Sequence, residues 1–144
     1  MNRVEQAVSC YKEGFSCAPA VFSAYALEFG VDIETALKIA TGFGAGMGRM
    51  GGTCGVLTGA FMVIGLKYGK TKAEDDQAKE KTYELVREFA KRFKSRNGTI
   101  VCNELLGCDL GTPEGMKLAK EKGAIDTLCP RFVQDAVEIL EEML

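Results

Sequence analysis

Apolar residues near the start of the chain recur at helical spacing. Val4, Ala7, Val8 and Tyr11 are three or four positions apart, which is the pattern of an α-helix with one buried face. Gly14 follows this pattern and is expected to end the helix. The first predicted element is therefore a helix over residues 3–13.

Capping signals divide the next segment into two further helices. Ser16 is a candidate N-cap for a helix that starts at Cys17 and ends at Gly30. Asp32 can cap a third helix, predicted over residues 33–43. The apolar positions expected to form the buried face of this third helix are Ile33, Ala36, Leu37, Ile39 and Ala40.

The rest of the chain also shows helical periodicity, with no run long enough for a confident strand. We predict a nearly all-apolar central helix over residues 53–68, a charged outer helix within residues 71–97, a short turn near residue 102, and a helix over residues 112–122. The last helix is expected to begin at Pro130, a residue favoured at the first helical position. The sequence thus indicates an all-α fold: a compact single domain over residues 1–144, with six to seven helices around a glycine-rich central loop.

Length and charge narrow the range of partners. The 144 residues suffice for one hydrophobic core, and a formal charge of -2 gives no reason to expect nucleic acid or an anionic membrane as a partner. No segment predicts a membrane span, and the first residues lack the apolar stretch of a secretory signal. We expect a cytoplasmic protein.

Six cysteines and no histidine limit the available chemistry. A reducing cytosol disfavours a static disulfide framework and favours metal ligation, redox cycling or plain core thiols. Without histidine, a Cys-His or Ser-His pair, a His-ligated zinc ion and a histidine-ligated haem are all excluded. Cysteine is therefore the main reagent.

Four cysteines are predicted to lie at or near helix starts: Cys17, Cys54, Cys102 and Cys129. A helix start carries unpaired amides and a partial positive charge, which stabilise a thiolate. The alternative is that these are inert buried thiols, which is common for free cysteine. Cys10, away from any cap, is assigned that role, and Cys108 is left open.

The glycine run before Cys54 contains a weak nucleotide-binding pattern. Gly46, Gly48 and Gly51 fit G-x-G-x-x-G, but a helix precedes them where the nucleotide fold requires a strand, so no nucleotide is expected. Arg49 is a cation beside Cys54 that could hold a thiolate or an anionic ligand. The candidate cofactor-binding residues of this loop are Arg49, Gly51, Gly52 and Gly55.

Four stretches carry a resemblance to a known family: "FSCAPAVFSAY", "GMGRMGGTCGVLTGAFMVIG", "RFKSRNGTIVCNELLG" and "LCPRFVQDAVEIL". Together they resemble the C_GCAxxG_C_C family of redox-active proteins. The resemblance places the family's cysteines at Cys17, Cys54, Cys102 and Cys129, while Thr53 stands where the family pattern has glycine. Related helical modules also look similar to a part of split-Soret cytochromes that carries an iron–sulfur centre. This sequence has no C-x-x-C-H, so the resemblance implies no haem.

Three hypotheses remain open at this point. In the first, the four cysteines meet and ligate an iron–sulfur cluster or another metal for electron transfer. In the second, one cysteine attacks and another resolves in a thiol/disulfide oxidoreductase. In the third, the chain is a binding or assembly module with structural cysteines, in which Gly55 and Gly59 permit close helix contact. An exposed face on the apolar helix predicted over residues 53–68 would favour a homodimer. The sequence names neither a redox partner protein nor a small-molecule acceptor.

Overall fold

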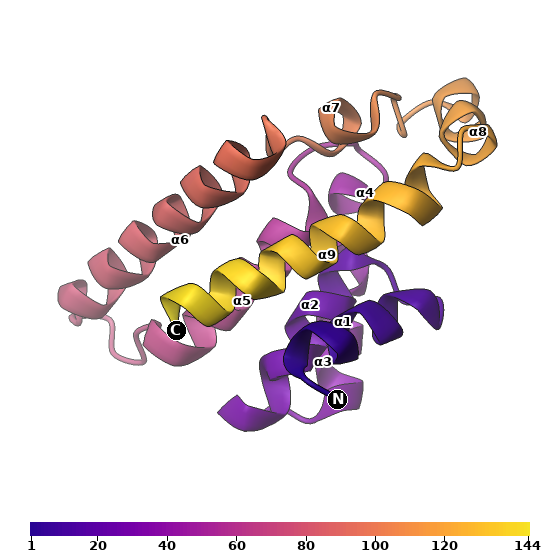
Figure 1. Cartoon of the computed structure of the whole chain (residues 1–144). Helices are drawn as coiled ribbons and strands as arrows, with labels where there is room; N and C mark the ends of the chain where they lie inside the picture. The colour runs from indigo at the N-terminus through magenta and orange to yellow at the C-terminus, as the bar shows by residue number, and fades with distance from the viewer.

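The computed structural model describes residues 1–144 and consists of α-helices joined by short connections (Figure 1). The helices are α1 (Arg3–Lys12), α2 (Cys17–Ala26), α3 (Ile33–Ala40), α4 (Gly44–Met47), α5 (Gly55–Tyr68), α6 (Asp76–Asn97), α7 (Cys102–Leu106), α8 (Pro113–Glu121) and α9 (Ala124–Met143), with 3₁₀ turns at Leu27–Phe29 and Thr41–Phe43. Seven of the helices have seven or more residues, and the single β-type contact is a bridge between Thr53 and Val101. The predicted all-α fold is confirmed. None of the helices combines the length and the apolar composition needed to cross a lipid bilayer.

Helices α2 and α5 form the centre of the molecule. Nearly every residue of α2 is buried, and α5 packs along it. A side chain on Gly59 of α5 would come within 2.8 Å of the carbonyl oxygen of Ala18 in α2, so the two backbones approach as closely as their glycine and alanine allow. The glycine face of α5 therefore contacts another helix of the same chain.

The burial predicted for the third helix is wrong in part. Ala36 and Ala40 are buried, but 44% of Ile33 and 51% of Ile39 are exposed. Helix α3 packs mainly on α2, and small alanines let the two helices approach closely. The close contact with α2 therefore buries a narrower face of α3 than the apolar residues of its sequence predicted.

The predicted start of the last helix is also wrong. Helix α9 begins at Ala124, after Gly123 in the left-handed conformation, and Pro130 lies inside it. A proline in a helix removes one backbone hydrogen bond. In the preceding turns, the partly buried Ile125 and Leu128 pack against the core and hold this part of α9 in place.

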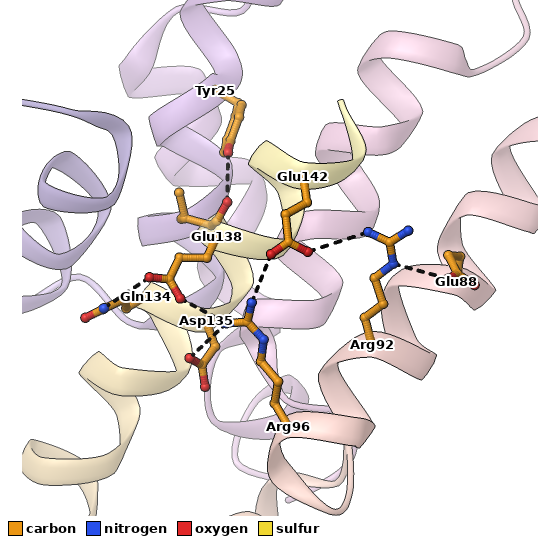
Figure 2. A network of polar contacts seen from close by, with 9 residues as sticks. Tyr25, Glu88, Arg92, Arg96, Gln134, Asp135, Glu138 and Glu142 are labelled. Carbon is orange, nitrogen blue, oxygen red and sulfur yellow. Dashed lines mark hydrogen bonds and ion pairs between the residues drawn. The ribbon is translucent and has the colours of Figure 1, made fainter.

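Helices α6 and α9 are joined by a cluster of charged side chains (Figure 2). The guanidinium of Arg96 on α6 contacts carboxylates of three α9 residues, Asp135 at 3.4 Å, Glu138 at 2.9 Å and Glu142 at 3.2 Å. Arg92 adds a contact of 3.6 Å to Glu142. These ion pairs fix the outer helix against α9, which crosses the molecule towards α7 and α8 (Figure 1).

Candidate functional site

One cavity of about 460 Å³ brings together sulfur atoms from four helices. Its lining includes Cys17 of α2, Cys54 before α5, Cys102 of α7 and Cys129 of α9. These are the four cysteines that the sequence singled out. Cys10 and Cys108 do not line the cavity.

Backbone pairing brings Cys54 and Cys102 to the same wall. The amide of Cys54 donates to the carbonyl of Ile100 at 2.8 Å, and the amide of Cys102 donates to the carbonyl of Gly52 at 2.6 Å. A further bond of 3.2 Å joins the amide of Asn103 to the carbonyl of Gly51. The end of the glycine run thus aligns with the start of α7, although the two are almost 50 residues apart in the sequence.

The glycine run also contains a turn of left-handed helix. All residues from Ala45 to Arg49 have φ between 56° and 70°, including three that are not glycine: Ala45, Met47 and Arg49. Each non-glycine residue in this conformation costs roughly 1–2 kcal/mol. Such strain is characteristic of functional sites, where the surrounding structure imposes it.

This left-handed turn lies next to the sulfur of Cys17. The backbone amides of Ala45, Ala18 and Gly55 all lie near enough to lower the pKa of the Cys17 thiol. They come from three segments, namely the left-handed turn, the first turn of α2 and the start of α5. A side chain on Gly55 would collide with the Cys17 sulfur, so glycine is required for this approach.

The neighbouring thiol of Cys54 has the largest effect on Cys17. Burial alone would raise the pKa of Cys17. The hydrogen bond from Cys54 and the three backbone amides outweigh burial and lower this pKa to about 7. The pKa of Cys54 is raised well above its usual value, first because of its hydrogen bond to Cys17 and then because of burial. Above pH 7 the pair therefore favours a thiolate on Cys17 and a thiol on Cys54.

The other two cysteines of the cavity favour the thiol form. Burial is the main cause that raises the pKa of Cys102 to about 12 and that of Cys129 to about 11, and the negative charge of Cys17 contributes to both. Contrary to expectation, Cys129 lies inside α9 and receives no helix-start amides. Its thiol instead has the Tyr11 hydroxyl as a hydrogen-bond partner.

The cysteines share a cavity without forming a ready ligand set. No group of three or more cysteine, aspartate or glutamate side chains is arranged to hold a metal ion. The residue types suit an iron–sulfur cluster or zinc, but the arrangement of side chains in this structure does not fit either.

The four loop residues expected to bind a cofactor have different positions. Arg49 lines the cavity, and Gly55 lies against Cys17. Gly51 and Gly52 pair with the start of α7 through their carbonyl groups and do not line the cavity. A side chain on Gly51, which has φ of 73°, would collide with the side chain of Asn103.

Sequence reasoning missed Tyr11 and Ala45. Tyr11 was assigned to the buried stripe of the first helix, yet its side chain lines the cavity and its hydroxyl donates to the carbonyl of Ile125 at 3.3 Å. Ala45 has no recognisable signal, because its contribution is a backbone amide in a conformation that alanine rarely adopts.

Comparison with known families gives one assignment that agrees with this geometry. The family model described as "Putative redox-active protein (C_GCAxxG_C_C)" matches residues 15–143, which include all four cavity cysteines. Searches of curated proteins and of solved structures found no match to the chain. Since the family model spans most of the sequence, the chain belongs to the C_GCAxxG_C_C family of putative redox-active proteins.

Proposed function

We propose that the protein carries out thiol/disulfide redox chemistry, with Cys17 as the attacking thiolate and Cys54 as the resolving thiol. One observation carries the proposal: Cys17 and Cys54 line the same cavity, with the backbone of Gly55 against the Cys17 sulfur. In this setting the Cys54 thiol and three backbone amides lower the pKa of Cys17 to about 7. A thiolate with a pKa near the ambient pH is the most effective attacking group in thiol–disulfide exchange.

The exchange proceeds in two steps. The Cys17 thiolate attacks one sulfur of a substrate disulfide, forming a mixed disulfide and releasing the other substrate sulfur as a thiolate. Cys54 then attacks the Cys17 sulfur of the mixed disulfide and releases the second substrate thiolate. The proton of Cys54 passes to one of the two released thiolates, and water supplies the proton for the other thiolate. The substrate gains two electrons, and the protein is left with a Cys17–Cys54 disulfide.

Peptide mapping after mild oxidation tests this assignment. The reduced protein is treated with diamide, free thiols are alkylated, and disulfide-linked peptides are identified by mass spectrometry. We expect a Cys17–Cys54 link that is absent from Cys54→Ser and retained in the matched control Cys108→Ser, whose thiol lies outside the cavity. A protein that forms no internal disulfide, or links other cysteines first, contradicts the proposal.

A thiolate-bound metal centre for electron transfer is the second candidate. The observation that favours it is that all four family cysteines line one cavity, which would bring ligands from four helices to one centre. Such a centre would supply one-electron chemistry, held by Cys17, Cys54, Cys102 and Cys129. The side chains of these four cysteines are not arranged as a ligand set in this structure.

Metal content and the visible spectrum of protein purified without oxygen separate the two candidates. Near-stoichiometric iron, and a charge-transfer band lost in the four single serine variants, would establish the metal centre. Metal-free protein that forms the Cys17–Cys54 disulfide would establish thiol/disulfide exchange.

A further inference from the structure

The wall of the cavity beyond the sulfur atoms is apolar. Apart from the four cysteines, 13 residues line the cavity, and eight of them are hydrophobic. The apolar side chains on the side of α7, α8 and α9 are Leu105, Leu106, Leu110, Met116, Ile125 and Phe132. A cavity of about 460 Å³ with such a wall has the size and composition of a small-molecule site.

Three further lining residues are polar: Ser16, Thr41 and Arg49, the last of them exposed to solvent. The backbone of Arg49 lies beside the connection between α7 and α8, where a side chain on Gly111 would be 3.6 Å from the Arg49 carbonyl oxygen. No carboxylate and no lysine line the cavity, so Arg49 is its only permanently charged side chain. It forms no ion pair within the chain, in contrast to Arg3, Arg92 and Arg96. Its charge is therefore available to a ligand.

We propose that this cavity binds a small molecule with an aliphatic body and a single anionic end, the body against the leucine-rich wall and the anion at Arg49. The chemistry of this inference rests on the proposed function. The reacting part of the ligand is a disulfide, which the aliphatic body presents to Cys17. The two-step exchange given above reduces this disulfide. The substrate class is an aliphatic disulfide with one carboxylate.

Charge matching excludes the more polar disulfides. A peptide disulfide with several carboxylates and ammonium groups would place most of its charges against apolar side chains, where unpaired charges are costly. The cavity offers one cation and no anionic side chain other than the reacting thiolate. A substrate with one negative charge uses that cation and leaves no other charge unpaired.

Binding of octanoate, which has the aliphatic body and the anion but no disulfide, tests the inference without any redox step. Its affinity is measured by isothermal titration calorimetry and compared with that of octanamide, which lacks the charge. The rate at which iodoacetamide alkylates Cys17 is measured with and without octanoate. The variants are Arg49→Gln, Met116→Trp to fill the cavity, and Arg131→Gln as a control at an exposed arginine outside the cavity.

We expect octanoate to bind, to slow alkylation of Cys17, and to bind about two- to fivefold more tightly than octanamide, the gain expected from a partly exposed ion pair. Arg49→Gln should remove that difference, Met116→Trp should weaken both ligands, and Arg131→Gln should change neither. Failure of octanoate to bind or to protect Cys17, or an equal effect of Arg49→Gln on both ligands, overturns the inference. Octanoate binding without any Cys17–Cys54 disulfide would instead overturn the proposed function and leave the binding site established.

Discussion

The backbone of Gly55 lies directly against the sulfur of Cys17. A methyl group at residue 55 would collide with that sulfur. This contact brings the amide at the start of α5 to the first residue of α2. The same glycine thus serves both the packing of the two central helices and the stabilisation of a thiolate.

Gly55→Ala should therefore damage stability and reactivity together. Overpacking at this contact is expected to lower the free energy of unfolding by about 1–3 kcal/mol. Displacement of the amide should raise the pKa of Cys17 and slow its alkylation at neutral pH. Urea denaturation and the rate of iodoacetamide modification measure the two effects.

Gly65→Ala is the matched control in the same helix. An added side chain there meets no atom within 4 Å, so the only effect is the higher helix propensity of alanine. We expect a gain of roughly 0.5–1 kcal/mol in the free energy of unfolding and no change in alkylation. Equal stability of the two variants would show that residue 55 is not packed against Cys17.

Two substitutions at Cys54 test whether its hydrogen bond lowers the pKa of Cys17. The Cys54 thiol is the largest cause of the lowered pKa of Cys17. Cys54→Ser keeps a hydroxyl donor, whereas Cys54→Ala removes it. We expect the pH profile of Cys17 alkylation to move to higher pH in Cys54→Ala and to change much less in Cys54→Ser. Identical profiles for the two variants would assign the lowered pKa to the amides alone.

The stability of the protein should depend on Cys17 at mildly alkaline pH. Its pKa in the folded protein, about 7, is below the unfolded value of 9.0, so the folded state binds fewer protons between these values. The resulting stabilisation is present above the unfolded pKa and is lost as pH falls through about 7. Relative to Cys17→Ser, the wild type should gain stability as pH rises from about 7 to 9.0. Guanidinium denaturation at each pH, under reducing conditions, checks this, and a constant difference would contradict it.

Much of the fold follows from local signals in the sequence. Asp32, a predicted cap, accepts a hydrogen bond from the amide of Thr35. Thr112, at the predicted start of the helix over residues 112–122, accepts one from the amide of Gly115. Pro130 misled because its preference for a helix start is statistical, while Gly123 and the burial of Ile125 set the actual start of α9. Ser16 stands at the predicted N-cap of α2 but makes no side-chain cap bond, so the cap bonds of Asp32 and Thr112 are not shared by every predicted cap.

The sequence predicted that four cysteines meet, and they line one cavity, but it did not predict the backbone geometry around them. A glycine at 46, 48 or 51 signals a backbone that favours positive φ, and all three adopt it. Nothing in the residue types of Ala45, Met47 or Arg49 indicates the same conformation, because tertiary contacts impose it against their preference. The expectation that helix starts would lower the pKa of every site cysteine was too simple, since burial prevails at Cys102 and Cys129.

The α6–α9 ion pairs predict a salt-dependent contribution to stability (Figure 2). Arg96 contacts three carboxylates, yet about a third of its side chain is exposed to solvent. Arg96→Gln should lower the free energy of unfolding by about 1 kcal/mol at low salt, and by less in 1 M sodium chloride. Arg87→Gln, on the same helix at an exposed residue without an ion pair, should change it little.

Acid should reduce the same contribution. Hydrogen bonding to Arg96 lowers the pKa of Glu138, so this stabilisation is lost as pH falls through that lowered pKa. Thermal denaturation of the two variants and the wild type at several pH values measures it. An Arg96→Gln deficit that persists in both salt and acid would assign the role of Arg96 to packing.

The left-handed turn makes an unusual prediction for Ala45. In an ordinary helix, replacing alanine by glycine costs about 1 kcal/mol, and this is expected for Ala90→Gly in α6. At Ala45, with φ of 56°, glycine removes a left-handed strain of about 1–2 kcal/mol, which offsets the greater freedom that glycine gives the unfolded chain. Ala45→Gly should therefore leave the free energy of unfolding unchanged or raise it by up to about 1 kcal/mol.

Because glycine keeps the backbone amide beside Cys17, alkylation of Cys17 in Ala45→Gly should keep its dependence on pH. Urea denaturation and iodoacetamide kinetics of both variants decide the matter, and a loss at Ala45→Gly as large as that at Ala90→Gly would show that residue 45 carries no such strain.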